Sequence, residues 1–240
     1  MEDTSSPPTH RSLWRTSPPK VWLVAAIVVL TIILLLAAAF SALKFRRQPF
    51  LGLFTEQTLV INGVGEREWS GYAAGLHIPE RILALDGHPL ADSADLWRTL
   101  SRYSPGDTVV LTVRDERTGA TRDVAVRLTT LPPDAFLNFF ILPYTIGIIY
   151  LGIGLWVFLM QRHQDAGLVF TLLCAVLALD MGLLFDLYTL HMLSWFWVVA
   201  MAMTGSVLFH LALMFPQRVR FLTKVPWLRG LVYIPGLALV

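Results

Sequence analysis

The chain has 240 residues, of which 55% are hydrophobic and only 15% are charged. Soluble globular domains carry about a quarter of charged residues, so much of this chain is expected to lie outside water. The net charge of +2, without a basic patch, argues against nucleic-acid binding. The single cysteine, Cys174, excludes an intrachain disulfide.

Long apolar runs predict a multi-pass membrane protein. Residues 21–43 carry no charge and exceed the about 20 residues that cross a hydrocarbon core, although a cleaved signal peptide is the alternative for this run. Further spans are predicted at residues 139–160, 167–185 and 193–215. Residues 228–240 predict the start of a fifth, truncated span, as in the front part of a longer protein. The polar, proline-rich residues 1–20 predict a disordered tail.

Lysine and arginine in short loops predict the orientation, because cytoplasmic loops carry an excess of them. The segment after the fourth span is basic, whereas "DLYTLHM", residues 186–192, contains neither lysine nor arginine. Lys44, Arg46 and Arg47 disagree with this orientation, but long translocated segments largely escape the rule. We therefore expect a cytoplasmic N-terminus in the cell membrane and an extracytoplasmic segment between the first two spans.

Residues 50–131 have the pattern of a small water-soluble domain. "TLVINGV", residues 58–64, predicts a strand that ends at a glycine. In "ERILALDG", Ile82 and Ala84 fall on one face and Leu83 and Leu85 on the other, which suggests a strand buried on both faces of a small barrel.

A helix and a hairpin are predicted to complete this domain. Asp92 or Ser93 can cap the helix "ADLWRTLSRY". "TVVLTVRD" and "RDVAVRL" alternate with period two around "ERTGAT" and predict a β-hairpin. The expected fold class is α+β, a multi-span α-helical membrane protein with an inserted, small, β-rich domain.

The run "AAGLHIPERILALDGHPL", followed by a helix and "SPGDTVVLTV", resembles the bacterial PDZ domain. The family has Ala-Gly-Leu, a Pro-Gly-Asp turn, an apolar strand, an Asp-Gly turn and a second Pro-Gly-Asp before a hairpin. This chain departs from that pattern at Ile78-Pro79-Glu80, where the first Pro-Gly-Asp is expected. That loop must therefore differ.

The resemblance implies a peptide-binding groove, since PDZ domains add an extended peptide to an open sheet edge. The family holds the peptide's terminal carboxylate on backbone N–H groups of an apolar-Gly-apolar loop, and the segment that matches is Phe50, Leu51, Gly52, Leu53 and Phe54. The groove helix would contribute Ala94, Trp97 and Arg98. The alternative is that "FLGLF" is an apolar linker that meets the membrane.

We expect no catalytic residue, cofactor or metal site in these residues. None of the six histidines belongs to a His-Glu-x-x-His motif, and no phosphate-binding loop or Cys/His cluster is present. Ser206 and His210 lie four apart on one helix, which allows a hydrogen bond but no dyad between helices. Asp180 is costly within a span, so we expect it to be partly solvated near the outer interface, with pairing to His210 as the alternative.

A second resemblance concerns the arrangement of the whole chain. "HLALMFPQR" at the end of the fourth span, after an anchor and an external PDZ-like domain, resembles multi-span sensor regions of bacterial signalling proteins. It implies the sensory input region of a histidine kinase that binds a peptide or protein and forms a homodimer. Two alternatives remain open: a PDZ-containing intramembrane protease with its active site beyond residue 240, and a non-catalytic membrane scaffold.

Overall fold

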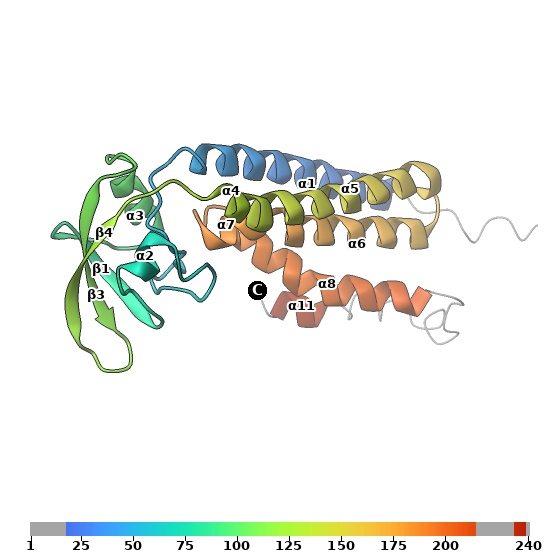
Figure 1. Ribbon diagram of the computed structural model, residues 1–240. Helices are drawn as coiled ribbons and strands as arrows, with labels where there is room; N and C mark the ends of the chain where they lie inside the picture. Colours follow the sequence, from blue (N-terminus) through green and yellow to red (C-terminus); the bar gives the residue numbers. More distant parts are fainter. Residues whose placement is uncertain (1–17, 215–232, 239–240) are drawn as a thin grey trace, which may run out of the picture. The chain divides into compact units, whose positions relative to one another are not determined.

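The computed structural model describes residues 18–214 and 233–238 (Figure 1). The chain divides into two compact units. The helical unit comprises Met1–Ile32, Ile149–Ala178 and Val199–Val240, and the module unit comprises Ile33–Ile148 and Leu179–Val198. Most of the predicted tail and most of the predicted fifth span lie outside the described residues; within the latter, α11 covers Ile234–Ala238.

Within the described residues, four helices are long and apolar enough to cross a membrane: Pro19–Phe45, Pro133–Gln161, Asp165–Tyr188 and Ser194–Met214. They comprise α1 (Pro18–Phe45), α4 (Pro133–Phe136) with α5 (Leu142–Gln161), α6 (Asp165–Gly182) with α7 (Leu184–Tyr188), and α8 (Ser194–Met214). These helices support a multi-pass membrane protein, as expected.

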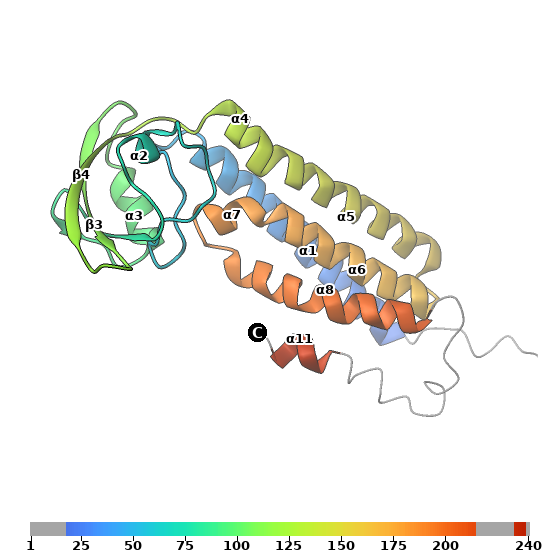
Figure 2. The ribbon, with the colours of Figure 1, turned by 60° about the horizontal axis from the view of Figure 1, so that its bottom comes forward.

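The second of these helices begins at Pro133, earlier than the predicted start at residue 139. It runs from α4 through a π-helical turn, η1 (Leu137–Ile141), into α5 (Figure 2). Leu142 N–H donates to Leu137 O, five residues back. Pro143 follows, and because proline lacks an N–H and crowds the preceding turn, a widened turn accommodates it.

In the helical unit, α6 packs against its neighbours through small and aliphatic residues. Val24 and Val28 of α1 form one cluster with Leu168, and Val169 and Leu173 form another with Val207 of α8. At Gly154 of α5 an added Cβ would lie 2.6 Å from Cys174 Cβ. This close approach lets Thr171 Oγ1 donate to Gly154 O at 3.2 Å.

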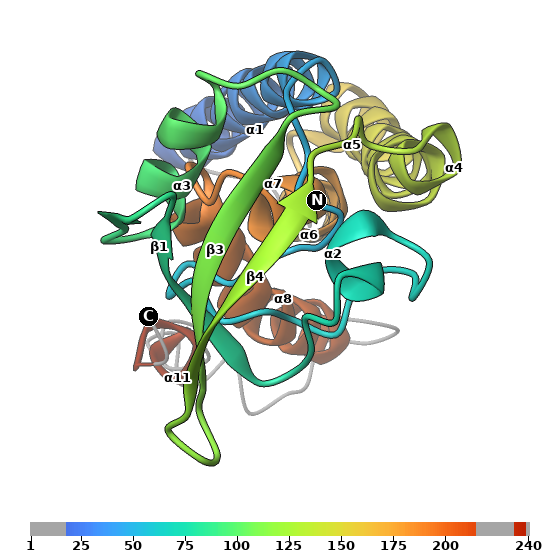
Figure 3. The ribbon, with the colours of Figure 1, turned by 60° about the vertical axis from the view of Figure 1, so that its left-hand side comes forward.

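The module unit contains an antiparallel sheet of four strands in the order β2-β1-β3-β4. The strands are β1 (Glu80–Leu85), β2 (His88–Pro89), β3 (Thr108–Asp115) and β4 (Thr121–Arg127). Figure 3 shows helix α3 (Ser93–Leu100) on the β1 side and helix α2 (Ser70–Ala73) on the β4 side. The β3–β4 hairpin is confirmed, with Thr108 opposite Arg127 and Arg114 opposite Thr121.

Strand β1 differs from its prediction. A bulge between Ile82 and Ala84 shifts the register, so Ile82 and Leu85 are both buried while Leu83 and Ala84 are only half-buried. The extra residue changes which face each later side chain meets. Residues 58–64, predicted as a strand, form only single bridges, such as Val60 with Arg81.

The core of the module unit includes the ends of apolar helices. Phe45 of α1 lies 4.6 Å from the Trp97 ring and 5.5 Å from the Phe185 ring, centroid to centroid. Phe136 and Phe140 belong to the same buried cluster. Residues 50–131 therefore share a core with these helix ends. Burying one such side chain is worth about 2–3 kcal/mol, so the shared core contributes to the stability of the unit.

Candidate functional site

The predicted carboxylate-binding segment, Phe50 to Phe54, is buried throughout. Phe50 exchanges backbone hydrogen bonds with Thr129, at 2.8 and 2.9 Å, which fixes the start of the segment. The Phe50 and Phe54 rings pack edge-on against Trp69, at 5.3 and 5.4 Å. This enclosure by the module's own core argues against a loose linker.

Backbone N–H groups in this segment lack acceptors. In the described part of the chain, those of Leu51, Gly52 and Leu53 make no hydrogen bond. Nearly all buried backbone N–H groups in proteins are paired, so a run of buried donors is unusual and suits an anionic ligand. The carboxylate-binding role stays a prediction, but these are the donors that it requires.

The chain after Phe54 forms a short extended edge. One side of it pairs with the next segment, through Asn62 N to Phe54 O at 3.1 Å and Glu56 N to Val60 O at 2.8 Å. The other side carries the N–H and C=O of Thr55. Because alternate residues of a strand direct their backbone groups to opposite sides, this second side is the one to which a peptide strand would add.

Helix α3 forms the second wall of the candidate groove, opposite the extended edge at Thr55. The Asp92 side chain caps it by accepting from Asp95 N at 2.8 Å, which resolves the predicted choice between Asp92 and Ser93. Of the predicted groove residues, Ala94 and Arg98 are exposed and Trp97 is buried. Only Trp97 therefore reaches the enclosed side.

The segment Tyr188–His191, which begins at the last residue of α7, contacts both the edge at Thr55 and helix α3. Sequence reasoning did not predict these contacts. Trp97 Nε1 donates to Thr189 O at 2.7 Å, and His191 Nε2 lies 3.0 Å from Thr55 O. Tyr188 stacks on Phe54 with ring centroids 6.1 Å apart. The sequence feature that could have indicated these contacts is the presence of a tyrosine, a threonine and a histidine in the short loop between two apolar runs.

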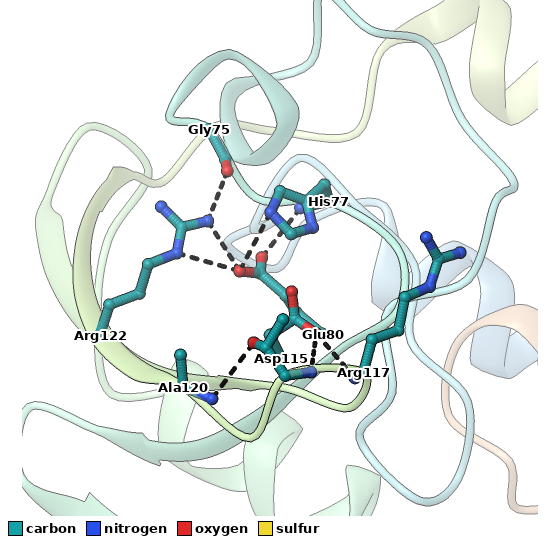
Figure 4. Close-up of polar contacts among 8 residues, drawn as sticks. Gly75, His77, Glu80, Asp115, Arg117, Ala120 and Arg122 are labelled. Atoms are coloured by element: carbon teal, nitrogen blue, oxygen red, sulfur yellow. Dashed lines mark hydrogen bonds and ion pairs between the residues drawn. The ribbon is translucent and has the colours of Figure 1, made fainter.

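The departure from the PDZ pattern is explained by Glu80, which is 1% exposed (Figure 4). Arg122 donates from Nε and Nη2 to Glu80 Oε1 at 3.0 and 2.7 Å, and His77 N donates to Oε2 at 2.9 Å. Arg122 also donates to Gly75 O, and the Ile78–Pro79 peptide bond is cis. Both carboxylate oxygens are engaged, so Glu80 closes this loop and offers no free base.

The predicted intramembrane polar residues are distributed over the two units. Asp180 belongs to the module unit and is 3% exposed, so it is buried in protein and not partly solvated as expected. Its backbone carbonyl accepts from Trp197 Nε1 at 2.9 Å. In the helical unit, Ser206 is buried and His210 Nδ1 lies 2.8 Å from the Tyr233 hydroxyl.

The described residues do not fit a metal centre. Within residues 18–214 and 233–238, no group of three or more His, Cys, Asp or Glu side chains is placed to hold an ion. Structural and catalytic zinc sites use at least three such protein ligands.

Comparison with known proteins gives one curated relative at 33% identity over 86 residues, the "Putative zinc metalloprotease" of Neisseria meningitidis serogroup A / serotype 4A. The match covers 36% of this chain and 19% of the relative, so the chain spans about a fifth of the relative's length. No family model matches. This finding overturns the sensor histidine kinase interpretation, and the homodimer that only that resemblance implied loses its support.

Solved structures also resemble part of the chain. An HtrA-type protease with a decapeptide is 20% identical, with a TM-score of 0.31 and coverage of 37% of this chain and 30% of that one. An aminopeptidase N family protein from Idiomarina loihiensis is 22% identical, with a TM-score of 0.29 and coverage of 38% and 17%. Both similarities are confined to a minor part of each chain.

Proposed function

We propose that this chain is the membrane-embedded, substrate-recognising part of a PDZ-containing intramembrane protease. The observation that carries the proposal is the 33% identity, over 86 residues, to a protein named as a zinc metalloprotease. The apolar helices support it, because the chain has the means to hold a recognition module at a membrane.

The catalytic metal would be held by sequence other than these 240 residues. No His-Glu-x-x-His motif occurs among the six histidines, and the described residues fit no zinc site. No catalytic step is therefore assigned to this chain. Its role in the proposal is to bind and present a polypeptide.

Peptide recognition would use the backbone of residues 51–55. A C-terminal carboxylate would accept hydrogen bonds from the N–H groups of Leu51, Gly52 and Leu53, and the peptide backbone would pair with Thr55. Hydrogen bonds to charged groups are worth about 1.5–3 kcal/mol, so the carboxylate should dominate affinity. Because the neighbouring residues Phe50, Leu53 and Phe54 are apolar and buried, an apolar last residue is expected.

The orientation is part of the proposal and rests on the distribution of basic residues. With the segment after the fourth helix in the cytoplasm, the PDZ-like module at residues 50–131 faces the extracytoplasmic side. Its substrates would then be exported or membrane-anchored polypeptides.

Peptide titration tests recognition. The full chain in lipid nanodiscs is titrated with fluorescein-labelled ten-residue peptides that end in valine, leucine or phenylalanine, each as the free carboxylate and as the amide. The carboxylates should bind at least tenfold more tightly than the amides, the equivalent of one charged hydrogen bond. Equal affinity for both forms would refute the carboxylate-binding loop.

The protease assignment needs the complete gene product. Purified from membranes, it should contain one equivalent of zinc and cleave a membrane-anchored model substrate. Replacement of Thr55 by proline, which removes the N–H from the open edge but leaves the hairpin bonds of Phe54 and Glu56, should slow cleavage by raising KM. A complete product without zinc would favour the scaffold alternative and refute the proposal.

A further inference from the structure

The segment Tyr188–His191 lies against the edge to which a peptide strand would add, and it contacts that edge through the His191 side chain. The Thr55 carbonyl, which a peptide strand would use as an acceptor, is bonded to the His191 imidazole at 3.0 Å. Since a carbonyl can only accept, His191 Nε2 carries the proton in this contact. Thr189 O receives Trp97 Nε1–H from the opposite wall, at 2.7 Å.

The segment is held in shape by Asp186. The Asp186 carbonyl accepts from Thr189 N at 3.1 Å and from His191 N at 2.9 Å, and its carboxylate accepts from Leu193 N at 2.7 Å. His191 adopts φ +55°, a left-handed conformation that is uncommon outside glycine. The turn therefore holds the imidazole in the position from which it donates to the Thr55 carbonyl.

The fit between segment and edge is incomplete. Thr55 Oγ1 and Ser93 Oγ, one from each wall, are buried without hydrogen-bond partners among the described residues. An unpaired buried hydroxyl is costly, so a ligand that satisfies these groups can compete with the segment. The N–H groups of residues 51–53 are likewise left for a ligand that carries a carboxylate.

We propose that Tyr188–His191 is an internal ligand that closes the recognition edge, and that a C-terminal peptide binds by displacing it. This inference rests on the proposed peptide binding. Because the segment joins α7 to α8, a bound peptide would release the connection between two apolar helices. Recognition outside the membrane would thereby be coupled to the conformation of the helices.

The coupling predicts that weakening the internal ligand tightens peptide binding. The peptide binds only to the open form, in which the segment is displaced. Its apparent affinity is therefore reduced to the fraction of molecules that are open. His191→Phe keeps an aromatic ring and removes the N–H donor to Thr55, so it should bind carboxylate peptides about fivefold more tightly, the equivalent of one net hydrogen bond. Trp97→Phe, which removes the donor to Thr189, is the second variant.

The experiment compares the full chain in nanodiscs with His191→Phe, Trp97→Phe and the matched control His88→Phe, whose histidine is exposed on β2. The same fluorescein-labelled carboxylate peptides are titrated, and hydrogen exchange of residues 188–193 is measured with and without peptide. We expect tighter binding by His191→Phe, wild-type affinity for the control, and faster exchange of the Thr189 and His191 amides upon peptide binding.

The outcomes separate this inference from the proposed function. Binding of equal affinity by the wild type and both groove variants, with unchanged exchange, would overturn the internal ligand and leave peptide recognition standing. No binding by the wild type or by any variant would overturn peptide recognition and the internal ligand together. If His191→Phe unfolds at a lower temperature than the control, the peptide affinity of Trp97→Phe is used instead to test the internal ligand.

Discussion

Gly52 and Gly119 share a backbone φ of +73° but differ in their surroundings. A Cβ at Gly52 would contact Ser70 Oγ and lie 2.6 Å from the backbone nitrogens of Ser70 and Gly71, whereas Gly119 has nothing within 4 Å. The glycine in "FLGLF" therefore permits both a left-handed residue and the close approach of α2. Its identity is explained by packing, whether or not a carboxylate binds beside it.

We predict that Gly52→Ala destabilises the protein more than Gly119→Ala. Both substitutions incur about 1–2 kcal/mol for a left-handed alanine, and the clash at Gly52 adds about 1–3 kcal/mol of overpacking. Urea unfolding followed by tryptophan fluorescence, with Trp69 and Trp97 as core reporters, measures both. Equal losses of stability would contradict the close approach.

Asp115 illustrates a charge that stabilises a turn. Backbone N–H groups of Thr118 and Arg117 donate to its carboxylate and lower its pKa. A lowered folded-state pKa means that the carboxylate contributes stability above the unfolded value of about 4, and that this stability is lost as the pH falls through the folded value.

The prediction is that Asp115→Asn is less stable than the wild type at pH 6, and that the difference shrinks as the pH falls below about 4. Thermal unfolding at intervals from pH 6 to pH 2 gives the comparison. A difference that stays constant over this range would mean that the hydrogen-bonded carboxylate is not responsible.

At the scale of elements, strand β1 shows a difference between what the local sequence pattern predicts and what tertiary packing produces. The residues of β1 are apolar on both faces, which predicted a strand enclosed by a barrel; a bulge instead places Ile82 and Leu85 toward the same core. The hairpin and the capped helix α3 were predictable because turn chemistry and alternation are local. The bulge was not, because it depends on the register with β3.

Helix α5 offers an element-scale test in the contrast between Gly154 and Gly152. Gly154 lies against Cys174 of α6, while Gly152 has nothing within 4 Å. Gly154→Leu should separate the two helices and cost about 1–3 kcal/mol by overpacking, whereas Gly152→Leu should be near neutral. Thermal unfolding in detergent, followed by circular dichroism, measures the difference. A near-neutral Gly154→Leu would show that this helix contact does not stabilise the unit.

At the scale of the molecule, the proposed orientation predicts opposite labelling of two positions. The control is the unsubstituted chain, whose cysteine, Cys174, is buried. Against this control, Ser104→Cys should react with a membrane-impermeant maleimide in intact cells. Gln217→Cys should react only after permeabilisation. Labelling of Gln217→Cys from outside would reverse the topology and place the recognition module in the cytoplasm.

The peptide-binding roles of the apolar-Gly-apolar loop and of helix α3 stay predictions. Both were derived from a local resemblance, namely the spacing of motifs along one PDZ-like stretch. The contacts of Thr189 and His191 with the two walls could not be found in this way, because these residues lie more than ninety positions along the chain from their partners, Trp97 and Thr55. The sensor interpretation was wrong because it assigned a function from the arrangement of spans and domains alone, and an architecture does not identify a function.

The amino-acid sequence by itself determined the apolar helices, the hairpin, the capped helix and the absence of a zinc-binding motif, since hydrophobic runs, turn residues and motifs are local properties. Tertiary structure alone decided that the small module shares its core with Phe45 and Phe185, and that His191 and Thr189 contact Thr55 and Trp97. Both outcomes depend on which distant segments bury each other's apolar surface and satisfy each other's polar groups. That choice is made by the packed chain as a whole and leaves no periodic trace in the sequence.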